Sequence, residues 1–176
     1  MTPPIEPDDK DWTWVLDRPC PECGFEAAGF DRGDLGAMIR QNAAAWTEVL
    51  AGDGVAVRTR DDRWSALEYA CHVRDVFRIY DERLALMLSQ DDPLFPNWDQ
   101  DAAAVDDDYA GQDPSAVAAG IVAAGERLAA AFDAVEGDQW RRPGRRSDGA
   151  SFTVESFARY FVHDPIHHLW DVGVTP

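Results

Sequence analysis

Apolar residues recur at intervals of three and four over four long stretches of this chain, which is the spacing of one face of an α-helix. The second stretch has the most complete stripe, and Ser65 followed by Glu68 has the form of a capping box at its start. The pattern predicts an all-α fold. The expected helices cover roughly 34–51, 66–89, 114–136 and 153–172.

Two segments lie outside this helical pattern. Prolines interrupt residues 1–30, so we expect an irregular N-terminal segment there, followed by a helical domain over 31–176. The connection 91–113 contains eight aspartates and no basic residue, and it is longer than ordinary connections. It is either a solvated crossover or a lid, in which the aromatic side chains of Phe95, Trp98 and Tyr109 close over a pocket.

The composition fits one folded domain. The chain has 176 residues, of which 45% are hydrophobic, and this is enough for a self-supporting core. A net charge of −17 argues against nucleic acid or an anionic membrane as partner. No apolar run approaches about 20 residues, and the N-terminus does not resemble a signal peptide. We therefore expect a cytoplasmic protein with no membrane partner.

The motif 20-CPECG-24 places two cysteines around a tight turn. Such a pair is half of a zinc knuckle, a redox pair, or simply a structural turn. No second CxxC follows, so a metal site here would need Cys71 or a histidine to complete it. The sequence leaves the roles of Cys20, Cys23 and Cys71 open.

The last expected helix holds three of the four histidines. His163 and His167 stand four apart, on the same face of a helix, where two imidazoles can bind one metal ion. His72 lies in the second helix, and a fold that joins the two helices would complete a three-nitrogen site. Pro165, between the paired histidines, should kink the helix, and this either aims the imidazoles at one point or spoils their register.

The remaining polar residues near these histidines receive supporting roles. Asp171 and Asp75 are within reach as hydrogen-bond partners of the ligands, and His168 points elsewhere and is interpreted as part of the core. Three imidazoles suit zinc, nickel, iron(II) or copper. We expect zinc or nickel, bound with an open position that lowers the pKa of a water or thiol. The alternative is that the four histidines have unrelated structural roles.

Four arginines lie in 140-WRRPGRRSDG-149, within a strongly acidic chain. Arg145 or Arg146 could hold the carboxylate of a small anionic ligand through bidentate hydrogen bonds. The alternative is pairing with nearby aspartates.

The segments 64-WSALEYACHVRDV-76 and 160-YFVHDPIHHLWDV-172, with the tryptophan and Pro-Gly of 140–149, resemble the DinB-like superfamily over roughly residues 34–172. That superfamily includes mycothiol-dependent maleylpyruvate isomerases and thiol S-transferases. The resemblance implies a four-helix bundle with a long crossover connection. It also implies a divalent metal held by His72, His163 and His167.

From this resemblance we expect a metal-dependent enzyme that activates a small thiol such as mycothiol for S-transfer or isomerisation of a small electrophile. Two alternatives remain. Water could replace the thiol, which makes the protein a hydrolase. The bundle could instead be a non-enzymatic metal-binding protein, in which Cys20, Cys23 or an acidic side chain closes the metal shell; a homodimer is compatible with this alternative. Family membership alone does not decide among them.

Overall fold

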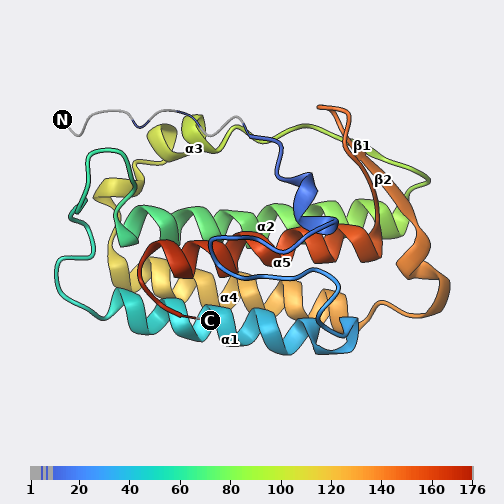
Figure 1. Cartoon of the computed structure of the whole chain (residues 1–176), viewed down its shortest axis with the longest axis horizontal. Helices are drawn as coiled ribbons and strands as arrows, with labels where there is room; N and C mark the ends of the chain where they lie inside the picture. The colour runs from blue at the N-terminus through green and yellow to red at the C-terminus, as the bar shows by residue number, and fades with distance from the viewer. Residues whose placement is uncertain (1–4, 6, 8–9, 176) are drawn as a thin grey trace.

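Four long helices form a bundle in the computed structural model, which describes residues 5, 7 and 10–175 (Figure 1). The predicted all-α four-helix bundle is confirmed, and each helix lies within a few residues of its predicted bounds. The parts of the predicted segments at residues 1–4, 6, 8–9 and 176 lie outside the described residues. The helices are α1 (Leu35–Leu50), α2 (Ala66–Ser89), α4 (Pro114–Asp133) and α5 (Val154–Asp171).

The bundle has a crossover between α2 and α4. Figure 1 shows α1 and α5 running in one direction, and α2 and α4 running in the other. Because α2 and α4 run parallel, the chain must return along the length of the bundle between them, over residues 90–113. This connection contains β1 (Leu94–Phe95), the short helix α3 (Gln100–Asp106) and a 3-10 turn, so it has secondary structure of its own.

Side chains satisfy the backbone groups at both ends of α2. Ser65 accepts a hydrogen bond from the Glu68 amide at 3.2 Å, and the Glu68 carboxylate accepts one from the Ser65 amide, as the capping box predicts. At the other end, the Arg142 guanidinium donates to the carbonyls of Met87 and Gln90. Arg142 thereby ties the 140–149 connection to the end of α2.

Two peripheral parts pack against the bundle. A three-stranded sheet in the order β1-β2-β3 joins the crossover to β2 (Pro143–Arg146) and β3 (Ser151–Thr153). β1 and β2 are parallel, whereas β2 and β3 form a hairpin that leads into α5. The N-terminal segment lies along α5, with the buried side chain of Val15 in a 3-10 turn against it.

Helix α4 is, by length and composition, apolar enough to cross a membrane. It is not an uninterrupted apolar run, however, because Glu126 and Arg127 lie within it. The helix nevertheless packs along α1 and α2, and its apolar side chains Ile121, Leu128 and Phe132 lie in the core. Because the core helix of a soluble bundle passes the same test, this is weak evidence for a membrane span.

The close contact of three helices at Gly125 generates a stability prediction. A Cβ placed there would come within 3.2 Å of both the Ala43 Cβ on α1 and the Phe77 ring on α2. We expect Gly125→Leu to lower the free energy of unfolding by about 1–3 kcal/mol, because the added side chain forces the helices apart. Urea unfolding followed by circular dichroism measures this. Ala130→Leu, at an exposed position of α4, is the control, and an equal loss there would contradict the prediction.

Candidate metal centres

Helix α5 presents two pairs of metal-ligating side chains, each four residues apart. One pair is His163 and His167, and the other is Asp164 and His168. The pairs are offset by one residue, which is about 100° around the helix, so they face different neighbours. The helix continues through Pro165, whose carbonyl accepts a hydrogen bond from the Asn42 side chain at 2.9 Å. The proline therefore leaves both pairs in register.

The first group joins α5 to α2. His72, Asp164 and His168 each place a ligand atom within 4.8 Å of the others. His72 Nε2 lies 3.3 Å from Asp164 Oδ2, and His168 Nε2 lies 3.8 Å from the same oxygen. His72 is almost fully buried, whereas the side chain of Asp164 is 33% exposed. The group thus has a buried side on α2 and a side that reaches solvent.

Neighbouring side chains hold the imidazoles of this group in place. The Asp171 carboxylate lies 2.9 Å from His168 Nδ1, so this nitrogen donates to the carboxylate and Nε2 faces Asp164. The indole of Trp98 stacks on the His72 ring, with 5.3 Å between the ring centroids and an angle of 12° between the planes. Trp64 contacts the same imidazole ring. Trp98 belongs to the crossover, so this segment covers one ligand of the group.

The electrostatics of the first group favour an ionised carboxylate. Burial alone would raise the pKa of Asp164, but the imidazoles of His72 and His168 outweigh burial, and the net effect lowers this pKa. Asp164 is therefore an anionic acceptor at neutral pH. Its Oδ1 and the Nδ1 of His72 are buried with no hydrogen-bond partner among the described residues.

The second group joins α5 to the N-terminal segment. Cys20, Cys23, His163 and His167 are all buried, and each places a ligand atom within 4.8 Å of the other three. Cys20 Sγ lies 3.6 Å from His167 Nδ1. The two imidazole centroids are 5.0 Å apart. The CxxC motif and the i,i+4 histidine pair, separate in the sequence, thus converge in the fold.

Burial dominates the protonation of the second group. It lowers the pKa of His163 to about 4, with a further contribution from the neighbouring His167, and it also lowers the pKa of His167. Burial raises the pKa of Cys23 to about 11, although a backbone hydrogen bond from Phe25 partly offsets this. At neutral pH both imidazoles are therefore neutral, which is the form that binds metal.

The structure divides the three predicted metal ligands between these groups. The sequence prediction joined His72 to His163 and His167, whereas the fold joins His72 to Asp164 and His168. Metal binding itself stays a prediction. The prediction omitted Asp164 and His168 because only the His/His pair was recognised as a chelating pair. The signal for the other pair was present, since Asp164 and His168 have the same i,i+4 spacing one residue along.

The other predicted site residues lie in ion pairs. Arg145 contacts Asp92 at 2.8 Å, and Arg146 contacts Asp148 at 2.8 Å. Pairing with nearby aspartates is thus what the structure contains, and an anion contact stays a prediction for both arginines. Asp171, predicted to support the ligand His167, lies 3.9 Å from His167 Nε2 and instead makes its short contact, at 2.9 Å, with His168 Nδ1. Asp75 instead accepts hydrogen bonds from other side chains: Arg74, Arg78 and Tyr109.

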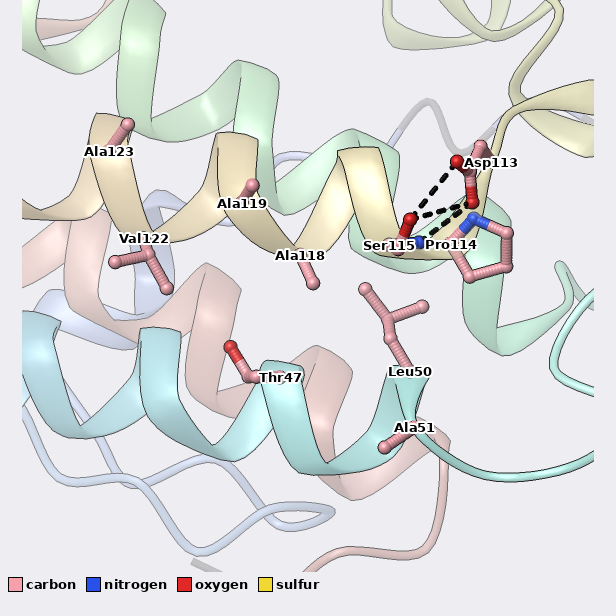
Figure 2. A pocket seen from close by; sticks show the side chains of 10 residues that line it. All are labelled: Thr47, Leu50, Ala51, Asp113, Pro114, Ser115, Ala118, Ala119, Val122 and Ala123. Carbon is pink, nitrogen blue, oxygen red and sulfur yellow. Dashed lines mark hydrogen bonds between the residues drawn. The ribbon is translucent and has the colours of Figure 1, made fainter.

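A hollow between α1 and α4 is lined by neither histidine nor cysteine, in contrast to the two groups on α5 (Figure 2). Most of its lining is alanine and other apolar side chains, including Leu50 and Val122. Its polar side chains are engaged locally, since Asp113 accepts hydrogen bonds from Ser115 and caps α4. We therefore place the candidate site at the histidine groups of α5.

Comparison with known proteins agrees with this fold. Residues 37–172 match the family model described as DinB superfamily. YfiT from Bacillus subtilis, described as a probable metal-dependent hydrolase with an unusual four-helix bundle topology, has a similar structure, with a TM-score of 0.61 at 19% sequence identity. The alignment covers 94% of this chain and 89% of that chain. Among curated protein sequences, none matches this chain. Because the family model spans most of its length, the chain belongs to the DinB superfamily.

Proposed function

We propose that this protein is a metal-dependent enzyme whose reactive ion is held by His72, Asp164 and His168. The convergence of two imidazoles and a carboxylate from α2 and α5 carries this proposal. Three protein ligands leave positions for water or substrate, which is typical of catalytic rather than structural sites.

The donor atoms fit such an ion. Nitrogen and oxygen ligands at about 2.0–2.1 Å from a tetrahedral ion lie about 3.3–3.4 Å from each other. His72 Nε2 and Asp164 Oδ2 are 3.3 Å apart, and His168 Nε2 is slightly farther from the same oxygen, at 3.8 Å. The unpartnered Asp164 Oδ1 further supports a missing positive partner, because a buried acceptor without a hydrogen bond is costly.

Each residue around the site has a defined contribution. Asp171 fixes the tautomer of His168, so that Nε2 presents its lone pair to the site. Trp98 and Trp64 hold the His72 ring and exclude water from the buried side. A divalent ion bound there would polarise an electrophile and lower the pKa of a bound water or thiol toward neutrality. The side chain of Asp164 is 33% exposed, so a substrate can approach the ion from this side of the group.

The ligand set favours hydrolysis. Two histidines and one carboxylate are the zinc ligands of several hydrolases, in which water is the nucleophile. The description of YfiT as a probable metal-dependent hydrolase points the same way, at the level of a shared fold. We propose that the substrate is a small ester, amide or related electrophile, and that the ion is zinc or nickel.

Thiol transfer is the second candidate. It depends on the resemblance of residues 64–76 and 160–172 to mycothiol-dependent members of the superfamily. In that reaction a thiol such as mycothiol takes the place of water, and Arg145 or Arg146 would hold its anionic group. Both arginines already pair with aspartates, so a ligand would have to compete with these ion pairs. A cytoplasmic location, a small-molecule partner and a homodimer stay predictions.

Metal analysis tests the ligand assignment. We expect His72→Ala and Asp164→Asn each to lose the reactive ion, because two remaining ligands bind weakly. Mass spectrometry of the purified proteins measures the metal content. Cys71→Ser is a matched control, since Cys71 is buried beside His72 on α2 but belongs to neither group. Unchanged metal content in both ligand variants would overturn the assignment.

The hydrogen bond from His168 to Asp171 gives a second prediction. We expect Asp171→Asn to weaken binding of the reactive ion by about 10- to 100-fold, because the imidazole loses the carboxylate that orients it. Competition with a chromophoric chelator measures this affinity. Glu155→Gln removes the same charge from the first turn of α5, where Glu155 pairs with Arg32 and Arg159, and it should bind metal normally. An equal loss in both variants would show a general charge effect instead.

Turnover assays distinguish the two candidate reactions. We expect the metal-loaded protein to hydrolyse members of a panel of chromogenic esters and amides without added thiol, and Asp164→Asn to fall to the background of metal-free protein. The same electrophiles with mycothiol test for a conjugate by mass spectrometry. Conjugate formation without hydrolysis would favour S-transfer. If the metal-loaded protein formed neither the hydrolysis product nor the conjugate, that result would contradict both reactions on these substrates.

A further inference from the structure

We propose that Cys20, Cys23, His163 and His167 bind a second ion, a zinc with a purely structural role, which fastens the N-terminal segment to α5. This site is separate from the proposed reactive centre and uses the other i,i+4 pair of the same helix. The argument depends on the turn that carries the cysteines, on the spacing of the donor atoms and on their burial.

The cysteines lie in a turn suited to a metal. The Gly24 amide donates to the Cys20 carbonyl at 2.9 Å, and the Cys20 amide donates to the Phe25 carbonyl at 2.8 Å, so the turn folds back on itself. Gly24 has φ +74°, a conformation that other residues adopt only with strain. A backbone hydrogen bond from Phe25 to the Cys23 sulfur stabilises a thiolate. The turn places the two sulfurs within 4.8 Å of each other and of the two imidazoles.

The donor spacing agrees with a tetrahedral ion. With metal–sulfur bonds of about 2.3 Å and metal–nitrogen bonds of about 2.0–2.1 Å, a sulfur and a nitrogen on one zinc lie about 3.6 Å apart. Cys20 Sγ and His167 Nδ1 are separated by 3.6 Å.

The environment of the histidines points to a missing ligand. His163 is only 5% exposed, and its Nε2 is buried with no hydrogen-bond partner among the described residues. An unpartnered buried nitrogen is costly, and a metal ion removes that cost. His167 turns its other nitrogen, Nε2, toward the Glu22 carboxylate at 3.4 Å, which leaves Nδ1 for the ion.

Two thiolates and two imidazoles favour zinc, and four protein ligands fill its coordination shell. When the ion binds, the two thiols release their protons and the imidazoles stay neutral. No position remains for a substrate, so the ion stabilises structure and takes no part in turnover. Arg159 donates to the carbonyls of Ala27 and Phe30, and this second attachment holds the same segment one turn earlier on α5.

The test measures zinc in the full-length protein before and after dialysis against a moderate chelator. We expect one zinc per chain to resist dialysis in the wild type. Cys20→Ser and Cys23→Ser should each lose this ion, whereas His72→Ala and Cys71→Ser should keep it. Limited proteolysis should then cut within residues 10–30 of the two Cys-to-Ser variants faster than in the wild type. This pattern differs from failure of the proposed enzyme, which would leave the dialysis-resistant zinc in place.

Spectroscopy on the wild type avoids dependence on variants that fail to fold. X-ray absorption at the zinc edge of the dialysed protein should show two sulfur and two nitrogen neighbours, at about 2.3 and 2.0 Å. Cobalt substituted at the same site should give sulfur-to-metal charge-transfer absorption. Three results would each overturn the proposal: a shell without sulfur, retention of the ion in both Cys-to-Ser variants, or a disulfide between Cys20 and Cys23 in protein purified without reductant.

Discussion

The periodicity of α5 is the constraint on which both candidate centres depend. Four residues within one six-residue stretch of α5 supply the candidate ligand atoms. Because each step along the helix rotates the side chain by about 100°, residues four apart share a face, and the four residues form two pairs on different faces. His163 and His167 face the N-terminal segment, whereas Asp164 and His168 face α2. One helix can therefore serve two sites with no ligand in common. This arrangement requires that the helix stay regular through Pro165, and the hydrogen bond from Asn42 to the Pro165 carbonyl supports that turn.

Asp171 connects the two centres physically. Its carboxylate lies 2.9 Å from His168 Nδ1 in one group and 3.9 Å from His167 Nε2 in the other. Arg63 contacts the same carboxylate at 3.4 Å. A change in the charge or position of His167 therefore acts on His168 through a single side chain. If the N-terminal segment holds His167 in place, it also contributes to the orientation of His168, a ligand of the proposed reactive ion.

The sequence was sufficient to predict the four long helices, because each has its own apolar stripe and end signals such as Ser65 and Asp113. The bundle with its crossover followed from the resemblance to the DinB-like superfamily. The sequence was insufficient to assign the ligands. Side chains of neighbouring residues on a helix point in directions about 100° apart, so choosing ligands one residue away selects a different face of the helix. No local feature of the sequence indicates which face of α5 contacts α2. Both HxxxH and DxxxH occur within six residues, so only tertiary contacts separate them. The partner of the CxxC turn lies 140 or more residues away in the chain and could not be chosen from spacing.

Charge balance explains why the two groups differ in composition. A divalent ion with two thiolates and two neutral imidazoles is neutral overall, and a neutral centre can be buried at modest cost. All four residues of that group are buried. A divalent ion with two imidazoles and one carboxylate keeps one positive charge, which a buried site would penalise but which polarises a bound water or electrophile. The corresponding group includes the partly exposed Asp164 and His168. The closed, neutral set thus fits the interior beneath the N-terminal segment, and the open, cationic set fits the side of the bundle that a substrate can reach.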